Sequence, residues 1–394
     1  MLLIVTQLID SNSSSTGYYW ERIIKTLSED NKILLITSET SEILESNKNI
    51  KVIQANISQH LKNHFNFGIG FLYKILISIL MLHYSIKFSR KVKNILIGTN
   101  PFLISLLPIF LKLFFIKAKV NIIIFDLFPE NLLHTSKNFF LRIFCNFLKI
   151  FFDISYRQFD KVFSIGRDMS KVLEEKKIKN NRIIYTPNWC DDDYNFDYSI
   201  QKNCLSALDV NFKPNKNIVL LFFGNLGRFQ NIDLLLDIIS KTKNKNLIFL
   251  FVGNGEKRNI IKEASLNDKR IYLKKGVDLS KRSNILACGD ISLVTLPDEM
   301  LGFAVPSKSY FSLAYGMPLF TIMNKMSEIT LLVEENNFGW CFSSEQKIEA
   351  ANLLDNLSIE EIKQKKDSIL RNKTKFSSFK TLNLIKNNLV NEIE

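Results

Sequence analysis

Three turns in the second half of the chain carry groups that could bind an anion. The first directly follows an apolar run and reads Gly224-Asn225-Leu226-Gly227-Arg228-Phe229-Gln230. Its glycines let the backbone approach a ligand closely, and Arg228 offers a fork of donors suited to phosphate oxygens. The second turn, Gly253-Asn254-Gly255, also follows an apolar run. Two such turns in succession indicate a site for a phosphorylated ligand.

The third turn reads Val305-Pro306-Ser307-Lys308-Ser309-Tyr310 and is followed by Gly316-Met317-Pro318. Pro306 suits the first turn of a helix, and Gly316 with Pro318 would end that helix. Free backbone amides at the helix start, together with Lys308, predict an anion site that faces the glycine turns. A capped surface helix without a ligand is the alternative.

A polar loop near the start of the chain is a weaker candidate. It runs from Asp10 to Gly17 and leads into a helix expected to begin near Tyr18. Such a loop can present backbone amides to an anion. An ordinary strand-to-helix turn explains it equally well.

Short apolar runs alternate with longer helical patterns, which is typical of parallel sheets covered by helices on both faces. In the first half, strands are expected near residues 2–6, 33–37, 50–54, 95–98, 121–125 and 162–165. In the second half, they are expected near 218–223, 247–252, 270–273, 290–295, 318–322 and 339–342. Two such series predict two doubly wound, Rossmann-like α/β domains. The turns described above follow strands, where such domains bind ligands.

The domain boundaries follow from composition. Residues 1–195 are expected to form the first domain and 218–375 the second, with a polar, irregular linker over 196–217. The last helical pattern, 376–394, either packs locally or crosses back to the first domain. The five cysteines are widely spaced without a C-x-x-C pair, so neither a disulfide framework nor a zinc site is indicated.

The positive charge of the chain is concentrated in one segment. Lys and Arg total 52 against 39 Asp and Glu, which gives a net charge of +13 over 394 residues. No acidic residue occurs between Glu45 and Asp126, whereas eleven basic residues do: Lys48, Lys51, Lys62, Lys74, Lys87, Arg90, Lys91, Lys93, Lys112, Lys117 and Lys119. Such an excess indicates an anionic partner. Long aliphatic runs between these residues disfavour nucleic acid.

Three apolar segments accompany this charge. Residues 67–82 and 102–116 are short and contain charges, which disfavours membrane-spanning helices. Residues 139–153 place Arg142, Asn146, Lys149 and Asp153 in one narrow polar stripe on an otherwise apolar helix. Either these helices cover a core, or they dock on an anionic membrane surface through residues 46–125 and 139–153.

Taken together, the turns resemble the second domain of GT-B glycosyltransferases, particularly the retaining enzymes of family 4. The motifs that carry the resemblance are Gly224-Asn-Leu-Gly-Arg, Val252-Gly-Asn-Gly-Glu and Pro306-Ser-Lys-x-Tyr-x-x-x-Ala-x-Gly-x-Pro318, in the family's order. In the first half, Asp126-Leu-Phe-Pro-Glu130 and Tyr185-Thr-Pro-Asn-Trp189 are similar to segments of a bacterial O-antigen and capsule branch that includes L-fucosamine transferases. The implied fold is two Rossmann-like domains facing each other across a cleft.

The resemblance implies retaining transfer of a sugar, an N-acetylated amino sugar, from a UDP-linked donor to a polyprenyl-diphosphate saccharide, without metal or other cofactor. Arg228 and Lys308 would stabilise the departing diphosphate, and Asp126 would orient or deprotonate the acceptor hydroxyl, with Glu130 and His134 beside it. A structural hydrogen bond is the alternative role for Asp126. The donor-binding residues would be Gly17, Gly224, Asn225, Gly227, Arg228, Gln230, Gly253, Asn254, Val277, Val305, Pro306, Ser307, Lys308 and Tyr310.

A departure from the family pattern and a shared architecture keep two other functions open. Many members carry a Glu-x7-Glu pair whose positions fall here on Phe303 and Phe311. This difference admits a catalytically inactive sugar-nucleotide-binding protein. A UDP-N-acetylglucosamine 2-epimerase shares the architecture, but the second half of this chain contains no histidine for its acid/base chemistry. The expected location is the cytoplasm, peripheral on the inner face of the cytoplasmic membrane.

Overall fold

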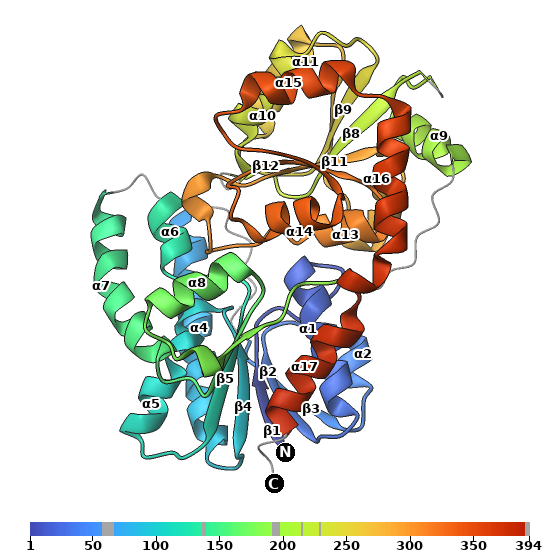
Figure 1. The fold of residues 1–394 in the computed structure, drawn as a ribbon. Coiled ribbons are helices and arrows are strands. Elements are labelled where there is room, and N and C mark those ends of the chain that lie inside the picture. Colours follow the sequence, from blue (N-terminus) through green and yellow to red (C-terminus); the bar gives the residue numbers. More distant parts are fainter. Residues whose placement is uncertain (57–66, 136–138, 191–197, 214–215, 228–229, 391–394) are drawn as a thin grey trace. The chain divides into compact units, whose positions relative to one another are not determined.

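The computed structural model describes residues 1–56, 67–135, 139–190, 198–213, 216–227 and 230–390. These residues form two compact units. The first unit comprises Met1–Pro187, Gly302–Ala304 and Phe379–Glu394, and the second comprises Asn188–Leu301 and Val305–Ser378 (Figure 1). Two short segments from late in the chain therefore belong to the first unit.

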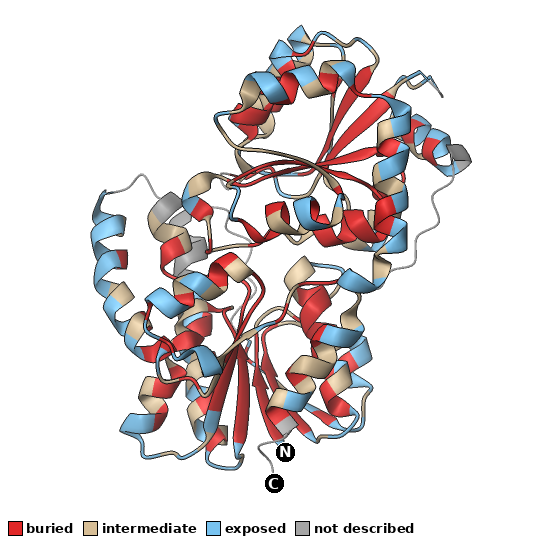
Figure 2. Cartoon of the chain, viewed as in Figure 1, coloured by how far each residue is buried: buried red, intermediate tan, exposed pale blue. Residues whose placement is uncertain are grey.

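The first unit is built on a seven-stranded parallel sheet in the order β3-β2-β1-β4-β5-β6-β7. Its strands are β1 (Leu2–Val5), β2 (Ile33–Thr37), β3 (Ile50–Gln54), β4 (Asn94–Gly98), β5 (Lys119–Ile124), β6 (Lys161–Ser164) and β7 (Ile183–Tyr185). β1, β2 and β4 are buried along their whole length, as expected for parallel strands covered on both faces (Figure 2). The order of the strands changes direction between β1 and β4.

The helices of the first unit begin with α1 (Ser15–Ser28), which Ser14 caps by accepting a hydrogen bond from Gly17. The others are α2 (Glu42–Glu45), α4 (Phe67–Ser89), η1 (Phe102–Leu106), α5 (Leu107–Leu113), α6 (Glu130–Thr135), α7 (Phe139–Tyr156), α8 (Arg167–Glu175), η2 (Asn180–Arg182) and α17 (Ser378–Val390). α4 packs on β1 and β2, and α7 contacts α5, α6 and η1. Among the described helices, none is long and apolar enough to cross a membrane.

The second unit has a six-stranded parallel sheet in the order β10-β9-β8-β11-β12-β13. Its strands are β8 (Ile218–Phe223), β9 (Leu247–Val252), β10 (Ile271–Lys274), β11 (Ile291–Thr295), β12 (Leu319–Ile322) and β13 (Gly339–Phe342). The change of direction falls between β8 and β11, which pair only at Ile291–Leu220 and Ser292–Leu221. The carboxyl ends of these two strands therefore separate, which is where doubly wound sheets bind ligands.

The helical elements of the second unit cover this sheet, and Phe222, Phe249 and Phe251 are fully buried in its core. In chain order they are α9 (Tyr198–Ala207), α10 (Ile232–Lys241), α11 (Arg258–Asn267), η4 (Leu279–Lys281), α12 (Arg282–Leu286), η5 (Asp298–Met300), α13 (Lys308–Ala314), α14 (Glu328–Asn336), α15 (Lys347–Asn356), α16 (Ile359–Arg371) and η6 (Lys373–Phe376).

Every strand expected from the sequence is present, within two residues at each end. The sequence prediction omitted β7, which is only three residues long. The expectation of an irregular linker over 196–217 is wrong in part, because α9 lies there and belongs to the second unit. Gln201 of α9 donates to the carbonyl of Cys288 at 3.3 Å, and Leu205 is fully buried. These contacts attach α9 to the second unit.

The C-terminal helix α17 packs on the first unit. The side-chain amide of Asn94 donates to the carbonyl of Leu389 at 3.5 Å, and Lys386 forms an ion pair with Asp30 at 2.5 Å. Of the two arrangements that the sequence left open for this helix, the structure therefore has the one that returns to the first unit.

Candidate functional site

The glycine turns after β8 and β9 interlock at the carboxyl edge of the second sheet. Gly224 N–H donates to the carbonyl of Val252 at 3.0 Å, and Leu226 N–H donates to that of Asn254 at 2.8 Å. A side chain at Gly253 would place its Cβ 1.9 Å from the carbonyl oxygen of Gly224, so only glycine fits. Asn254 also accepts from Gly276 N–H, which ties the turn after β10 to the same edge.

Lys308 lies at this edge on the first turn of α13. Its Nζ donates to Oε1 of Gln230 at 3.0 Å and lies 3.4 Å from the centre of the Phe222 ring. The Thr295 hydroxyl at the end of β11 donates to the carbonyl of Gln230. Lys308 and Gln230 therefore occupy the opening between β8 and β11.

Burial lowers the pKa of Lys308 well below its usual value. No carboxylate contacts the ammonium group among the described residues; its partners are the neutral amide of Gln230 and the aromatic ring of Phe222. A buried ammonium group without a counterion is stabilised when an anion binds beside it. The chemistry of this position thus favours a phosphate group as ligand.

The start of α13 differs from the sequence expectation. Pro306 precedes the N-cap residue Ser307, so it lies outside the first helical turn. The amides of Ser309 and Tyr310 donate to the carbonyls of Pro306 and Ser307, both at 3.1 Å. Two of the amides expected to be free for an anion are thus already bonded. The positive charge at this position comes chiefly from the Lys308 side chain.

The other residues expected to bind the donor are placed as follows. Asn225 and Gly227 lie in the turn after β8, Val277 follows β10, and Val305 and Tyr310 are buried around α13. Gly17 lies in α1 of the first unit, where its Cα packs against the carbonyl of Asp10. Arg228 lies outside the described residues.

Phe311 occupies the position at which many members of the family carry the second glutamate of the Glu-x7-Glu pair. Phe311 is buried, and the guanidinium group of Arg282 lies 4.7 Å from the centre of its ring. A cation over an aromatic face is a stabilising arrangement in its own right. Phe311 therefore has a packing role in this chain.

Asp126 lies in the first unit, just after β5. It forms an antiparallel bridge with Ala304, and the neighbouring Leu127 N–H donates to the carbonyl of Phe303 at 3.0 Å. Asp126 is half-buried, and burial raises the pKa of its carboxyl group from 3.8 to about 6. The carboxylate is thus ionised at neutral pH but is a stronger base than an exposed aspartate.

Glu130 lies in a charge network of the first unit. Its carboxylate is buried and forms an ion pair with the ammonium of Lys176, which also pairs with Asp153. Lys149 lies 3.6 Å from the same Glu130 oxygen. Glu130 therefore belongs to a charge network in which its Oε1 contacts these cations, and its acceptor-side role stays a prediction. The side chain of His134 lies outside the described residues.

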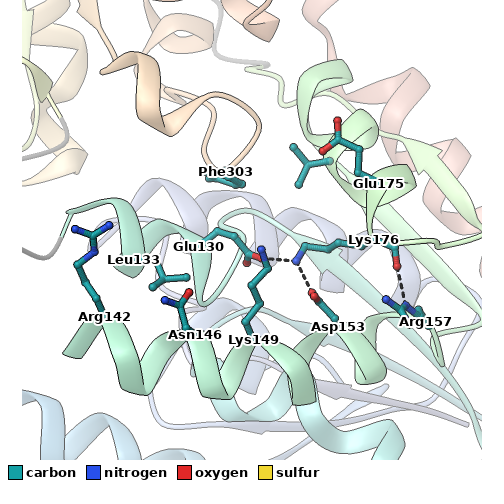
Figure 3. Close-up of a pocket in the computed structure, with 11 residues that line it drawn as sticks. Glu130, Leu133, Arg142, Asn146, Lys149, Asp153, Arg157, Glu175, Lys176 and Phe303 are labelled. Atoms are coloured by element: carbon teal, nitrogen blue, oxygen red, sulfur yellow. Dashed lines mark hydrogen bonds and ion pairs between the residues drawn. The ribbon is translucent and has the colours of Figure 1, made fainter. Parts of the chain in front are cut away.

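This charge network lines a pocket of about 470 Å³ in the first unit (Figure 3). The lining residues come from α6, from α7 and α8 together with the residue that follows each of these two helices, and from the segment Gly302–Ala304: Glu130, Leu133, Arg142, Asn146, Lys149, Asp153, Arg157, Val172, Glu175, Lys176 and Phe303. The polar stripe expected on residues 139–153 faces this pocket. The role of Lys176 had no sequence signal, because the residue belongs to an ordinary Glu-Glu-Lys-Lys run at a helix end.

Among the described residues, no group of three or more His, Cys, Asp and Glu side chains is arranged to hold a metal ion.

Comparison with known proteins places this fold among the glycosyltransferases. No family model matches the chain. The chain is 28% identical over 370 residues to a Pseudomonas aeruginosa protein named "Probable glycosyltransferase WbjE", covering 90% of this chain and 89% of that protein. WaaG, a glycosyltransferase involved in lipopolysaccharide biosynthesis, superposes with a TM-score of 0.72 at 10% identity, over 99% of this chain and 100% of WaaG.

Anabaena Alr3699/HepE, in complex with UDP and glucose, superposes with a TM-score of 0.68 at 13% identity, over 99% of both chains. The chain therefore has the fold of the GT-B glycosyltransferases: two Rossmann-like α/β domains, each with a parallel sheet. The fold class expected from the sequence is confirmed.

Proposed function

We propose that the protein is a glycosyltransferase that acts in the biosynthesis of a bacterial surface polysaccharide. The observation that carries this proposal is Lys308, which is half-buried at the opening between β8 and β11, beside interlocked glycine turns, and has no carboxylate partner among the described residues. The relationship to WbjE and the likeness to WaaG support the same activity.

The donor in this proposal is a UDP-linked sugar, and the sugar is an N-acetylated amino sugar. Support for UDP comes from its presence in the HepE complexes, and support for the amino sugar comes from motifs similar to the O-antigen branch of family 4. Titration calorimetry with UDP, GDP and dTDP tests the nucleotide. UDP is expected to bind at least tenfold more tightly than the other two, and equal affinities would contradict this assignment.

The proposed reaction proceeds with retention. The C–O bond to the diphosphate breaks, the acceptor oxygen attacks from the same face, and the acceptor proton passes to a base. Lys308 stabilises the negative charge that develops on the diphosphate; a charge-assisted contact of this kind contributes about 1.5–3 kcal/mol. No metal or other cofactor is required for this role. Asp126 orients the acceptor hydroxyl and accepts its proton.

Substituting Asp126 by Asn is expected to abolish transfer while stabilising the protein at pH 8. Because burial raises the pKa of the folded carboxyl from 3.8 to about 6, ionisation costs folding free energy as pH rises through this window. Removing the charge should raise the free energy of unfolding by about 1–3 kcal/mol at pH 8 and by little at pH 4. Wild-type transfer should fall as pH drops below about 6.

Denaturant titrations at both pH values and a pH–rate profile measure these effects. A variant that is inactive but less stable at pH 8 would assign Asp126 a structural role. A variant that retains full activity would remove Asp126 from the mechanism.

The acceptor in this proposal is lipid-linked, and the protein works at the inner face of the cytoplasmic membrane. The supporting feature is an apolar arc of exposed side chains on α7 and at the end of α5: Phe139, Phe140, Ile143, Phe144, Phe147, Ile150, Phe151, Ile154, Leu113, Phe114 and Phe115. Phe140 is 81% exposed and Phe115 is 92% exposed. Lys112 and Lys117, both exposed, flank the last three residues of the arc. Apolar side chains beside lysines suit the interface of an anionic bilayer.

Replacing Phe140 and Phe147 together by Ser is expected to weaken binding to phosphatidylglycerol vesicles at least tenfold, because each side chain loses its burial in the interface. Vesicle flotation measures the bound fraction. The matched control replaces Leu266 and Ile348, which are exposed in the second unit, and should bind like the wild type. Equal binding of wild type to phosphatidylcholine and phosphatidylglycerol would contradict the electrostatic contribution.

A further inference from the structure

Helix α7 presents three different faces along its length. Cys145, Phe152 and Tyr156 are buried against the first unit. The polar stripe of Arg142, Asn146, Lys149 and Asp153 lines the pocket (Figure 3). The apolar arc covers the remaining face and is exposed. A helix that serves only to cover a core needs one apolar face, so the second apolar face requires another explanation.

The charged residues that line the pocket carry one more positive than negative charge: Arg142, Lys149, Arg157 and Lys176 against Glu130, Asp153 and Glu175. Lys176 forms ion pairs with Glu130 and Asp153, which neutralise its charge. Lys149 is 43% exposed and lies 3.6 Å from an oxygen that Lys176 already holds. Arg157 donates through Nε to the carbonyl of Lys176 at 2.7 Å, and within the described ranges no carboxylate forms an ion pair with it. Arg142 lines the pocket from the exposed side of α7.

The pocket adjoins the residue proposed as the base. Phe303 lines the pocket, its carbonyl accepts from Leu127 N–H, and the next residue, Ala304, bridges to Asp126. The volume of 470 Å³ lies within the range of pockets that hold a small ligand. A ligand bound along the polar stripe would therefore reach toward Asp126.

The apolar arc begins directly beside the stripe. Ile143 is three residues before Asn146 and Ile150 is four residues after it, so both are its neighbours on the helix surface. A ligand with an anionic head in the pocket could lay an apolar chain across these two side chains. One helix would then contact both parts of an amphiphilic molecule.

We propose that the pocket binds the diphosphate of the lipid-linked acceptor through Arg142, Lys149 and Arg157, with the polyprenyl chain on Ile143 and Ile150 of the apolar arc. This inference rests on the proposed function and deepens it, because it names the acceptor subsite. The diphosphate fixes the position of the acceptor, and the saccharide attached to it extends toward Asp126.

Titration calorimetry with farnesyl diphosphate tests the subsite without requiring turnover. Arg142→Ala and Lys149→Ala are each expected to weaken its binding about tenfold to a hundredfold, because each removes a charge-assisted contact. Lys171→Ala is the matched control, since Lys171 is exposed on α8 and does not line the pocket. It should bind like the wild type.

Inorganic pyrophosphate and farnesol separate the two parts of the ligand. Both should bind more weakly than farnesyl diphosphate, and Ile143→Ser combined with Ile150→Ser should lower the affinity for farnesyl diphosphate toward that for pyrophosphate. Unchanged binding in Arg142→Ala and Lys149→Ala would overturn the subsite. Pyrophosphate binding as tightly as farnesyl diphosphate would overturn the role of the arc.

UDP titration of the same variants distinguishes the failure of this inference from that of the proposed function. If UDP binds and farnesyl diphosphate does not, the subsite is wrong and the donor proposal stands. If neither binds to the wild type, the proposed function fails as well.

Discussion

Replacing Lys308 by Met is expected to lower the rate of sugar transfer about tenfold to a hundredfold while leaving the protein folded. Lys308 places a positive charge at the opening between β8 and β11. Its ammonium group contacts Gln230 and the ring of Phe222. Methionine keeps the apolar contact with Phe222 but cannot stabilise the departing diphosphate. Stability should stay the same or rise, because the variant no longer buries an ammonium group.

The measurements are initial rates of transfer and thermal unfolding of the wild type and the variant. Lys262→Met is the matched control, since Lys262 is exposed on α11 and should tolerate the change in both measurements. Full activity of Lys308→Met would remove this residue from the donor site.

The low pKa of Lys308 adds a second readout to the same prediction. Because burial lowers this pKa in the free protein, a diphosphate beside the ammonium should raise it again, and a proton should be taken up on binding. Calorimetry of UDP binding in buffers of different ionisation enthalpy measures this uptake, and affinity should fall as pH rises. The uptake should disappear in Lys308→Met.

Replacing Lys176 by Met is expected to destabilise the protein by about 3–5 kcal/mol, the largest effect on stability that we predict. Lys176 is buried and is the cation shared by Glu130 and Asp153. Without it, the buried carboxylate of Glu130 has only the more distant Lys149 as a cationic partner among the described residues. Negative charge that is buried without compensation opposes folding.

Denaturant titration measures the free energy of unfolding of this variant. The triple variant that adds Glu130→Gln and Asp153→Asn should recover most of the loss, because the charges that Lys176 neutralises are then absent. Lys171→Met should change stability by less than about 0.5 kcal/mol. A loss this small in Lys176→Met itself would show that the network does not stabilise the fold.

The strands were predictable from sequence because each is a short, continuous apolar run between polar turns. β8, Ile-Val-Leu-Leu-Phe-Phe, is an example. β7 was missed because three residues are too few to show a period. α9 was missed because polar runs flank it in the sequence, although five of its ten residues are apolar.

The candidate site was predictable where a charged side chain lies in or near a glycine-containing turn. It was less predictable where charged residues that are far apart in the sequence form ion pairs. Gln230 and Lys308 were expected near one another, and their side chains are hydrogen-bonded. The free amides expected at Ser309 and Tyr310 are used in turn hydrogen bonds, which depend on backbone geometry that no motif reports. Lys176 pairs with residues 46 and 23 positions away, and such separations leave no local pattern.

The spacing of residues 139–153 predicted the polar stripe, but it did not predict whether the stripe faces solvent or a pocket. A stripe on an apolar helix normally faces solvent, with the apolar side packed on the core. In α7 the stripe faces a pocket, and a second apolar face is exposed. Periodicity defines the faces of a helix, whereas tertiary contacts decide which of them is covered.

Sugar transfer itself tests the central claim most directly. The purified protein is incubated with UDP-N-acetyl amino sugars and a polyprenyl-diphosphate-linked saccharide, and mass spectrometry follows the acceptor. The account predicts an acceptor heavier by one sugar residue in the wild type and about tenfold to a hundredfold less of it in Lys308→Met. Binding of UDP without transfer or hydrolysis, across UDP-, GDP- and dTDP-sugars, would contradict the claim and favour a catalytically inactive sugar-nucleotide-binding protein.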